Sequence, residues 1–335
     1  MCLNIVWKKK GKIMSSYNKD YIERIAQEKG FLRDNLEKVM RLAEILSYFG
    51  KSEQLGKSLA LKGGTAINLT VFEMPRLSVD IDLDFCLDVS REEMIDIRQS
   101  VNKEILYYMS AEGYVLKPGT KNPHTLDSWV FGYTNAAGNL DNIKIEINYS
   151  DRCHALPVIE KEVHIDFLGN MKVNVISPIE LFASKINALI SRAAIRDIYD
   201  VNGMICEQLF KSEEEINLLR KIFIFYMAVG SSCKAEDVTL QRKNFKHIET
   251  LGFAQVRAQL IPVLRKNEKF DYLTCKERVL DFLNNFLIFS ENEKSFIAHF
   301  NQREYQPELL FGDSDITERI KNHPMALWKC RPHER

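Results

Sequence analysis

The sequence lacks any uninterrupted apolar run of the roughly 18 residues that a membrane-spanning helix requires. Its first seven residues are mainly apolar and precede Lys8, Lys9 and Lys10, which reverses the charge order of a secretory signal. The residues from Met14 onward look more typical of a protein N-terminus. We therefore expect residues 1–13 to be a mis-assigned extension upstream of the natural start at Met14. These absences predict a protein of the cytoplasm.

Metal-binding and nucleophile motifs are also missing. The seven cysteines are scattered and form no Cys-x-x-Cys pair, which argues against a zinc site and against a disulfide framework. The seven histidines show no i,i+4 spacing, and no serine or cysteine lies in a Gly-x-Ser-x-Gly context. A zinc enzyme and a hydrolase with that nucleophile motif are therefore disfavoured.

The chain has no excess of either charge, because Lys and Arg total 46 and Asp and Glu also total 46. A protein that merely coats nucleic acid is usually basic. Any contact with nucleic acid must therefore depend on local positive charge. Two basic segments, residues 241–247 and 265–269, are candidates, although a solvated helix face is the favoured interpretation of each.

The most informative segment that is present reads Asp80-Ile81-Asp82-Leu83-Asp84. In a β-strand, alternate side chains point to opposite faces, so the three acids share one face and the apolar residues share the other. Neighbouring carboxylates repel each other. A divalent cation such as Mg²⁺ or Mn²⁺ would explain why they are gathered, because hard cations take carboxylate and phosphate oxygens as ligands.

A matching anion site lies just upstream at Gly63-Gly64-Thr65, which precedes a helix-like run over residues 66–72. Glycines allow backbone N–H groups to approach a phosphate, and a helix N-terminus carries partial positive charge. Each half of this pattern is weak alone, but their combination is rare. It predicts phosphoryl or nucleotidyl transfer.

The expected secondary structure changes character along the chain. A helix is expected over residues 17–50, and a second begins at Ser90, with Glu93 completing a capping box, and ends near Glu112. The expected strands are residues 128–134, 142–149, 162–165 and 172–176. Ser177-Pro178-Ile179-Glu180 combines a capping box with proline at the first helical position, and helical periodicity follows. We therefore expect an N-terminal extension and helix (1–55), an α/β core (56–176) and a helical C-terminal domain (177–335).

Lys144-Ile145-Glu146 lies in the return strand of the expected hairpin. Strand alternation puts Lys144 and Glu146 on one face. If this strand is a neighbour of the acidic one, Glu146 can join Asp80 and Asp82 to complete a metal site, or accept a proton from an attacking hydroxyl. The alternative is the ordinary polar face of a hairpin.

The expected helix after Ser177 carries Lys185, Arg192 and Arg196, whose separations place them near one stripe. Three cations on a stripe repel one another unless an anion such as a triphosphate lies between them. Asp197 and Asp200 follow, and Arg196 could instead pair with Asp200. A helix break near Arg192 would remove Arg196 from the stripe, and for this cluster alone a solvated helix face is the favoured interpretation.

Together these motifs resemble the AbiEii/AbiGii toxin branch of the nucleotidyltransferase (DNA polymerase β-like) superfamily. The resemblance is carried by Gly63-Gly64-Thr65 with Arg76–Leu83, by Lys144-x-Glu146, and by Lys185-x-x-Ala188-x-x-x-Arg192-x-x-x-Arg196-Asp197-x-x-Asp200. The closing segment 323–329 is also similar to the family's tail. It implies an α+β fold, with a nucleotidyltransferase-type mixed sheet, flanking helices and a helical C-terminal domain.

The resemblance implies a toxin that transfers a nucleotide from an NTP to RNA, in studied relatives to the 3′ end of tRNA, and a separate antitoxin that is often a DNA-binding repressor. Asp80, Asp82 and Glu146 would be the Mg²⁺ ligands and, with Lys144 and Asp197, the catalytic residues. The nucleotide-binding residues would be Gly63, Gly64, Thr65, Lys185, Arg192 and Arg196.

Two other functions are compatible with parts of the pattern. A small-molecule nucleotidyltransferase of the aminoglycoside-modifying kind shares the first motif, but the segments at 144–146 and 185–200 favour the toxin branch. A catalytically inactive relative that acts as a binding module would be expected to have lost an acid, and Asp80, Asp82 and Glu146 are all present.

Overall fold

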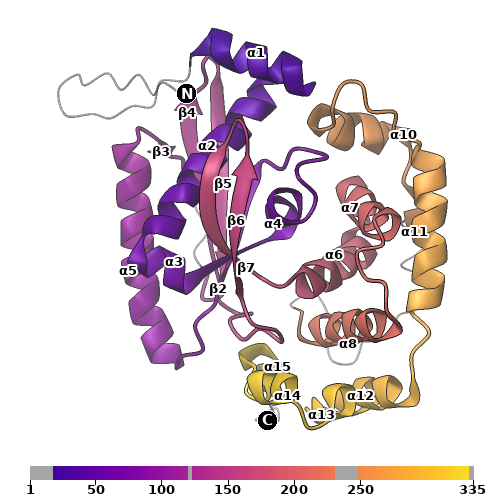
Figure 1. Ribbon diagram of the computed structural model, residues 1–335. Helices are drawn as coiled ribbons and strands as arrows, with labels where there is room; N and C mark the ends of the chain where they lie inside the picture. Colours follow the sequence, from indigo (N-terminus) through magenta and orange to yellow (C-terminus); the bar gives the residue numbers. More distant parts are fainter. Residues whose placement is uncertain (1–17, 120–122, 231–247, 332–335) are drawn as a thin grey trace.

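A seven-stranded mixed sheet is the centre of the fold (Figure 1). The computed structural model describes residues 18–119, 123–230 and 248–331, so the expected extension 1–13 and the basic segment 241–247 lie outside the described residues. The strand order is β3-β4-β5-β2-β1-β7-β6. The strands are β1 (Leu59–Lys62), β2 (Asp80–Phe85), β3 (Val115–Leu116), β4 (Leu126–Thr134), β5 (Leu140–Asn148), β6 (Ile159–Ile165) and β7 (Gly169–Val175).

The acidic strand β2 lies in the middle of this sheet, antiparallel to β1 and parallel to β5. Ile81, Leu83 and Phe85 are all buried, as the alternation predicts. The predicted hairpin forms as β4 and β5, and the second predicted pair forms as β6 and β7. β2 and β5 are adjacent, so the condition under which Glu146 could approach the acidic strand is met.

The N-terminal part contains two helices, so the prediction of one helix over residues 17–50 is wrong. α1 (Lys19–Lys29) ends at Gly30, whose φ of 77° is left-handed and whose N–H donates to the carbonyls of Ala26 and Gln27. α2 (Arg33–Lys51) then packs against β7. Three further helices belong to this half: α3 (Glu53–Ser58), α4 (Gly63–Thr70) and α5 (Arg91–Ala111). Ser90 and Glu93 form the predicted capping box of α5.

The described residues after 176 contain helices and turns and no named strand, which agrees with the predicted change of character. In Figure 1, α5 lies on one side of the sheet, and α4, α6, α7 and α8 lie on the other. α6 packs against both α7 and α8, and α7 packs against α11. The elements are α6 (Pro178–Arg192), α7 (Ile195–Cys206), α8 (Glu213–Val229), α10 (Phe253–Gln255), η2 (Val256–Leu260), η3 (Ile261–Val263), α11 (Tyr272–Phe286), α12 (Glu291–Asn301), α13 (Glu308–Phe311), α14 (Asp315–Ile320) and α15 (Pro324–Lys329). The expected α+β class with a helical C-terminal region is confirmed, whereas the domain boundaries remain predictions.

The start of α6 has only half of the predicted capping box. Ser177 accepts a hydrogen bond from the Glu180 backbone N–H at 3.4 Å, and Pro178 occupies the first turn. The Glu180 side chain turns inward instead, where its Oε1 accepts from the Ala155 N–H at 2.8 Å and the Tyr226 hydroxyl at 2.5 Å. Because Glu180 is fully buried, interior donors bind its Oε1 in place of the exposed helix end, while its buried Oε2 has no hydrogen-bond partner in the described structure.

α6 ends at Arg192, because Ala193 adopts a left-handed conformation with a φ of 48°. Arg196 therefore belongs to α7, and the predicted single stripe of three cations on one helix is wrong. The basic segment 265–269 also differs from its interpretation as a helix face, since it is a loop between η3 and α11. Lys266 in this loop donates its N–H to the Gly30 carbonyl at 2.7 Å.

Across the described ranges, no helix combines the length and apolar character needed to cross a membrane.

Candidate active site

The Gly-Gly-Thr turn is the first turn of α4, directly after β1, and packs against the acidic strand. Gly63 has a φ of 70°, and a Cβ at this position would lie 2.5 Å from Asp82 Oδ2. A Cβ on Gly64 would lie 3.0 Å from both Arg76 Nη2 and Ser78 Oγ. Thr65 donates its hydroxyl to the Asp80 carbonyl at 2.5 Å. Only glycine permits this close approach, which places the N-terminus of α4 beside the carboxylates.

The strand register gathers the predicted carboxylates. Asp82 lies opposite Lys62 on β1 and opposite Glu146 on β5, while Asp80 lies opposite Lys144. Burial raises the pKa of Asp82; Lys62 opposes that shift, and the negative charges of Asp80 and Glu146 add to it. A carboxylate that is buried beside two others is stabilised when a cation binds.

The donor chemistry of this group fits a hard divalent cation. Asp80 and Asp82 offer carboxylate oxygens on the same face of β2, which are the ligands that Mg²⁺ prefers. Glu146 instead accepts a hydrogen bond from Lys144 Nζ at 2.5 Å, and within the described ranges no three Asp, Glu, His or Cys side chains converge in a metal-binding arrangement. The assignment of Asp80, Asp82 and Glu146 as metal ligands therefore remains a prediction.

A pocket of about 420 Å³ opens between the ends of β1 and β2 and the helices α6 and α8. Four of the predicted site residues line it, namely Gly63, Asp82, Lys185 and Arg192. The other lining residues are Lys62, Asp84, Asp151, Ile176, Leu181, Ser184, Asn187, Ala188, Ser191, Tyr226, Val229 and Gly230. Its volume is within the range of small-molecule sites, and its wall combines the glycine turn with three acids (Asp82, Asp84 and Asp151) and three cations (Lys62, Lys185 and Arg192).

Lys185 and Arg192 are held in place by Asp197 on the next helix. Lys185 Nζ lies 3.0 Å from Asp197 Oδ1 and 3.1 Å from Asp200 Oδ2. Arg192 Nε donates to Asp197 Oδ2 at 2.8 Å. Burial would raise the pKa of Asp197, but Lys185 and Arg192 more than offset it, so the pKa is lowered. In this arrangement Asp197 is an ionised anchor that positions two cations at the pocket.

Asp200 pairs with Arg76 and not, within the described part of the chain, with Arg196. Arg76 Nε and Nη2 donate to its two carboxylate oxygens at 2.8 and 2.6 Å. Arg76 also approaches the Gly64 turn, so a single guanidinium connects the glycine turn to α7. Arg76 was not among the predicted site residues, although it alternates in phase with Ser78 and Asp80 along the same segment.

Lys62 and Asp84 are two further charged residues of the candidate site that were not among the predicted site residues. They form an ion pair in the pocket wall, and burial raises the pKa of Asp84 to about 7 in spite of Lys62. Alternation along the strand puts Asp84 on the same face as Asp80 and Asp82, and this pattern in the sequence could have identified Asp84 as a site residue. Lys62 could be placed only once the pairing of β1 with β2 was known.

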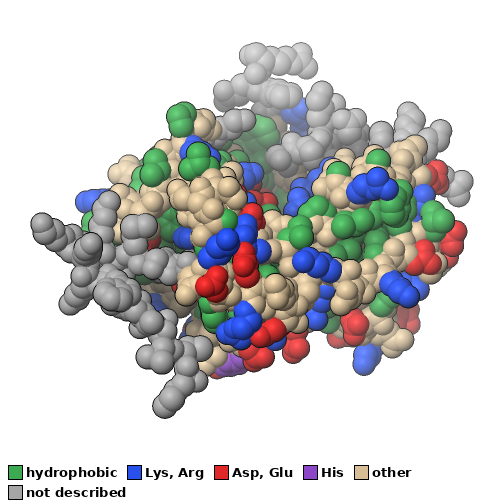
Figure 2. Space-filling model, turned by 90° about the horizontal axis from the view of Figure 1, so that it is seen from above, with side chains coloured by type: hydrophobic (Ala, Val, Ile, Leu, Met, Phe, Trp, Pro, Cys, Tyr) green, Lys and Arg blue, Asp and Glu red, His purple; other side chains and the backbone are tan. Residues whose placement is uncertain are grey.

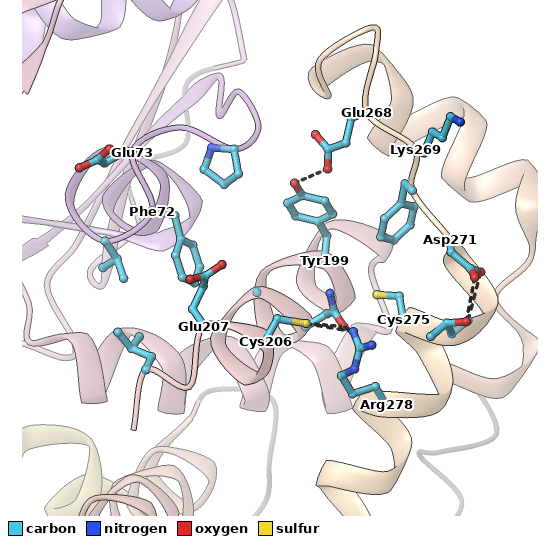
Figure 3. A pocket seen from close by; sticks show the side chains of 17 residues that line it. Phe72, Glu73, Tyr199, Cys206, Glu207, Glu268, Lys269, Asp271, Cys275 and Arg278 are labelled. Atoms are coloured by element: carbon cyan, nitrogen blue, oxygen red, sulfur yellow. Dashed lines mark hydrogen bonds between the residues drawn. The ribbon is translucent and has the colours of Figure 1, made fainter. Parts of the chain in front are cut away.

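A second pocket, of about 770 Å³, lies between the end of α4, α7 and the start of α11 (Figure 3). None of the predicted site residues lines it. Tyr199 donates to Glu268 at 2.7 Å, and Arg278 donates to Asn202 at 2.8 Å. Its acids outnumber its bases, with Glu73, Glu207, Glu268 and Asp271 against Lys269 and Arg278. This excess of negative charge disfavours a triphosphate, so the smaller pocket is the candidate active site.

Comparison with known proteins identifies the family and the fold. The family described as nucleotidyl transferase AbiEii toxin, type IV TA system, matches residues 46–278. Among solved structures, MenT4, a nucleotidyltransferase toxin from Mycobacterium tuberculosis H37Rv, superimposes with a TM-score of 0.61 at 15% identity, over 93% of this chain and 99% of that chain. No curated protein sequence matches the chain. Since the family match spans well over half of its residues, the chain belongs to the AbiEii nucleotidyltransferase toxins of type IV toxin–antitoxin systems.

Proposed function

We propose that the protein transfers a nucleoside monophosphate from an NTP to RNA, with the 3′ end of tRNA as the acceptor, in a Mg²⁺- or Mn²⁺-dependent reaction in the cytoplasm. The observation that carries this proposal is the contact between the Gly63 turn and Asp82, in a pocket that Lys185 and Arg192 also line. Phosphate-binding and acidic groups thus share one small cavity.

Each element of the site has a role in this reaction. The N–H groups of Gly63, Gly64 and Thr65 bind phosphate oxygens, as helix N-termini do. Lys185 and Arg192 neutralise the triphosphate, which is the main requirement in phosphoryl transfer. A divalent cation held by Asp80 and Asp82 would supply further neutralisation of the phosphates.

Glu146 is the residue we assign to the proton of the attacking hydroxyl. It lies opposite Asp82 in the register, and Lys144 donates to its Oε2 at 2.5 Å, which orients the carboxylate. A carboxylate held in this way can accept a hydrogen bond from a ribose hydroxyl and then its proton. Arg196, on α7, is a candidate contact for the nucleotide or for the RNA phosphates.

The choice of a structured RNA end follows from the charge of the chain. The net charge is zero, and Figure 2 shows Lys and Arg interspersed with Asp and Glu on the face it displays. Sequence-independent binding along an RNA requires many cations. A short, local contact with a shaped end requires few. Membership in a toxin–antitoxin family supports a cognate antitoxin, which we propose is a separately encoded DNA-binding repressor.

Incubation of the purified protein with total RNA, Mg²⁺ and each α-labelled NTP in turn tests the proposal. We expect label in the tRNA fraction, none with the Asp82→Asn variant, and more label on tRNA than on an unstructured RNA of equal length. Labelling of an aminoglycoside without labelling of any RNA would show instead that the enzyme modifies small molecules.

A further inference from the structure

The candidate active-site pocket has one charged wall and one neutral wall. On α6, the residues Lys185 and Arg192 lie on one stripe, while Ser184, Asn187 and Ser191 lie on a second stripe at spacings of three and four residues. The C-terminal end of α8 faces this second stripe with Tyr226, Val229 and Gly230. No Lys, Arg, Asp or Glu belongs to either of these two neutral sets.

A nucleoside triphosphate has the same division into a charged part and a neutral part. If its phosphates lie at Gly63, Lys185 and Arg192, the remaining space for ribose and base lies toward Asn187 and α8. The volume of about 420 Å³ is within the range that encloses one small molecule. The neutral wall is therefore the part of the pocket that remains for the base.

Asn187 is the polar side chain best able to read it. Its Nδ2 donates to the Tyr226 carbonyl at 3.4 Å, and its Oδ1 accepts from Ser191 Oγ at 3.5 Å. Both distances lie at the long limit for a hydrogen bond. An amide has two donors and two acceptor positions, so Asn187 keeps one N–H and one lone pair for a ligand.

The neighbouring hydroxyls discriminate less. Ser184 and Ser191 can rotate to donate or accept, so they suit any base. The hydroxyl of Tyr226 is engaged by buried Glu180 at 2.5 Å. The amide of Asn187, oriented by contacts to Tyr226 on α8 and Ser191 on α6, presents a donor–acceptor pair, and a base with the wrong pattern leaves polar groups unpaired.

Resting on the proposed function, we infer that Asn187 determines which NTP the enzyme uses, by hydrogen bonding to the polar edge of the nucleobase. The test is kcat/KM for ATP, CTP, GTP and UTP with the wild type and with Asn187→Ala, using tRNA as acceptor. We expect the ratio between the best NTP and the next best to fall at least about fivefold, the effect of one lost hydrogen bond, mainly through KM.

Two variants complete the design. Asn285→Ala makes the same change on the exposed face of α11 and should leave the NTP ranking unchanged. Asn187→Asp keeps the side-chain shape and removes the N–H donors, so it supplies the test even if the alanine variant folds poorly. We expect it to change which NTP is preferred.

The same ranking is measured at equilibrium by competition of the four NTPs against a fluorescent nucleoside triphosphate. An unchanged ratio in both Asn187 variants, or a wild type that does not distinguish the four NTPs, would overturn the inference. Absence of transfer by the wild type would refute the proposed function alone, because the competition experiment still reports whether Asn187 selects the base.

Discussion

Removal of the Arg76 guanidinium should destabilise the protein more than most single substitutions. The side chains of Arg76 and Asp200 are 2% and 1% exposed, and two hydrogen bonds of 2.8 and 2.6 Å join them. Arg76→Met would leave a buried carboxylate with Lys185, at 3.1 Å, as its remaining ionic partner in the described structure. Loss of one partner of a buried pair costs about 3–5 kcal/mol, and the retained lysine favours the lower end, about 3 kcal/mol.

The assay is thermal or urea unfolding of Arg76→Met beside two controls. Arg24→Met removes the exposed Arg24–Glu28 pair and should cost at most about 1 kcal/mol. The double variant Arg76→Met/Asp200→Leu removes both buried charges and should recover most of the loss. If Arg76→Met were as stable as Arg24→Met, or if the double variant were less stable than the single one, the electrostatic argument would be wrong.

The dependence of this loss on pH provides a second measurement. In the wild type, Arg76 and Lys185 hold the pKa of Asp200 below its usual value against the opposing effect of burial. A lowered pKa gives stability that is present above the unfolded-state pKa near 4 and is lost as pH falls through the folded-state value. Without Arg76, burial should dominate and raise that pKa. The difference in stability between wild type and Arg76→Met should therefore shrink on acidification toward pH 4.

Three further predictions concern the active site. Asp82→Asn should abolish nucleotide transfer and leave the melting temperature near that of the wild type; near-normal transfer would show that Asp82 is not a metal ligand. Gly63→Ala should weaken NTP binding in an equilibrium assay, because the new Cβ would meet the Asp82 carboxylate. The control is Gly138→Ala, which should leave NTP binding unchanged, because Gly138 has a comparable φ of 84° but a Cβ there would have no neighbour within 4 Å. Equal NTP affinity in these two glycine variants would refute the close-approach argument. Induced expression of the wild type without its antitoxin should arrest growth, and Asp80→Ala should relieve the arrest; continued arrest would separate toxicity from transfer.

Local signals in the sequence predicted the elements that depend on local chemistry. Ser90 with Glu93 and Ser177 with Pro178 mark helix starts that the structure confirms. The alternation in β2 correctly predicted its buried face. The helix end at Gly30 was not predicted, since a glycine within a periodic segment is weak evidence for a break. The helix end at Ala193 was left open, since alanine rarely adopts a positive φ.

Contacts between distant segments could not be read from the sequence in the same way. The partners of Lys185 and Arg192 depend on how α7 turns back after Ala193, and those of Arg76 depend on α7 lying beside the glycine turn. The sequence indicated some of the charged residues that line the candidate pocket, namely Asp82, Lys185 and Arg192, but not Lys62. It did not show that Asp197 would be engaged by two cations, or that Glu180 would turn inward.

The adjacency of β2 and β5 also has a consequence for biosynthesis. The two strands are separated by more than fifty residues that include α5, and Lys185 and Asp197 come later still. Pairings at such a sequence distance form slowly, and a ribosome adds only about 5–20 residues per second. The nascent chain therefore lacks a complete set of the proposed phosphate-binding residues for on the order of ten seconds after the glycine turn is made. A fragment that ends before α7 would lack Asp197 and Asp200 and should be harmless to the cell that produces it.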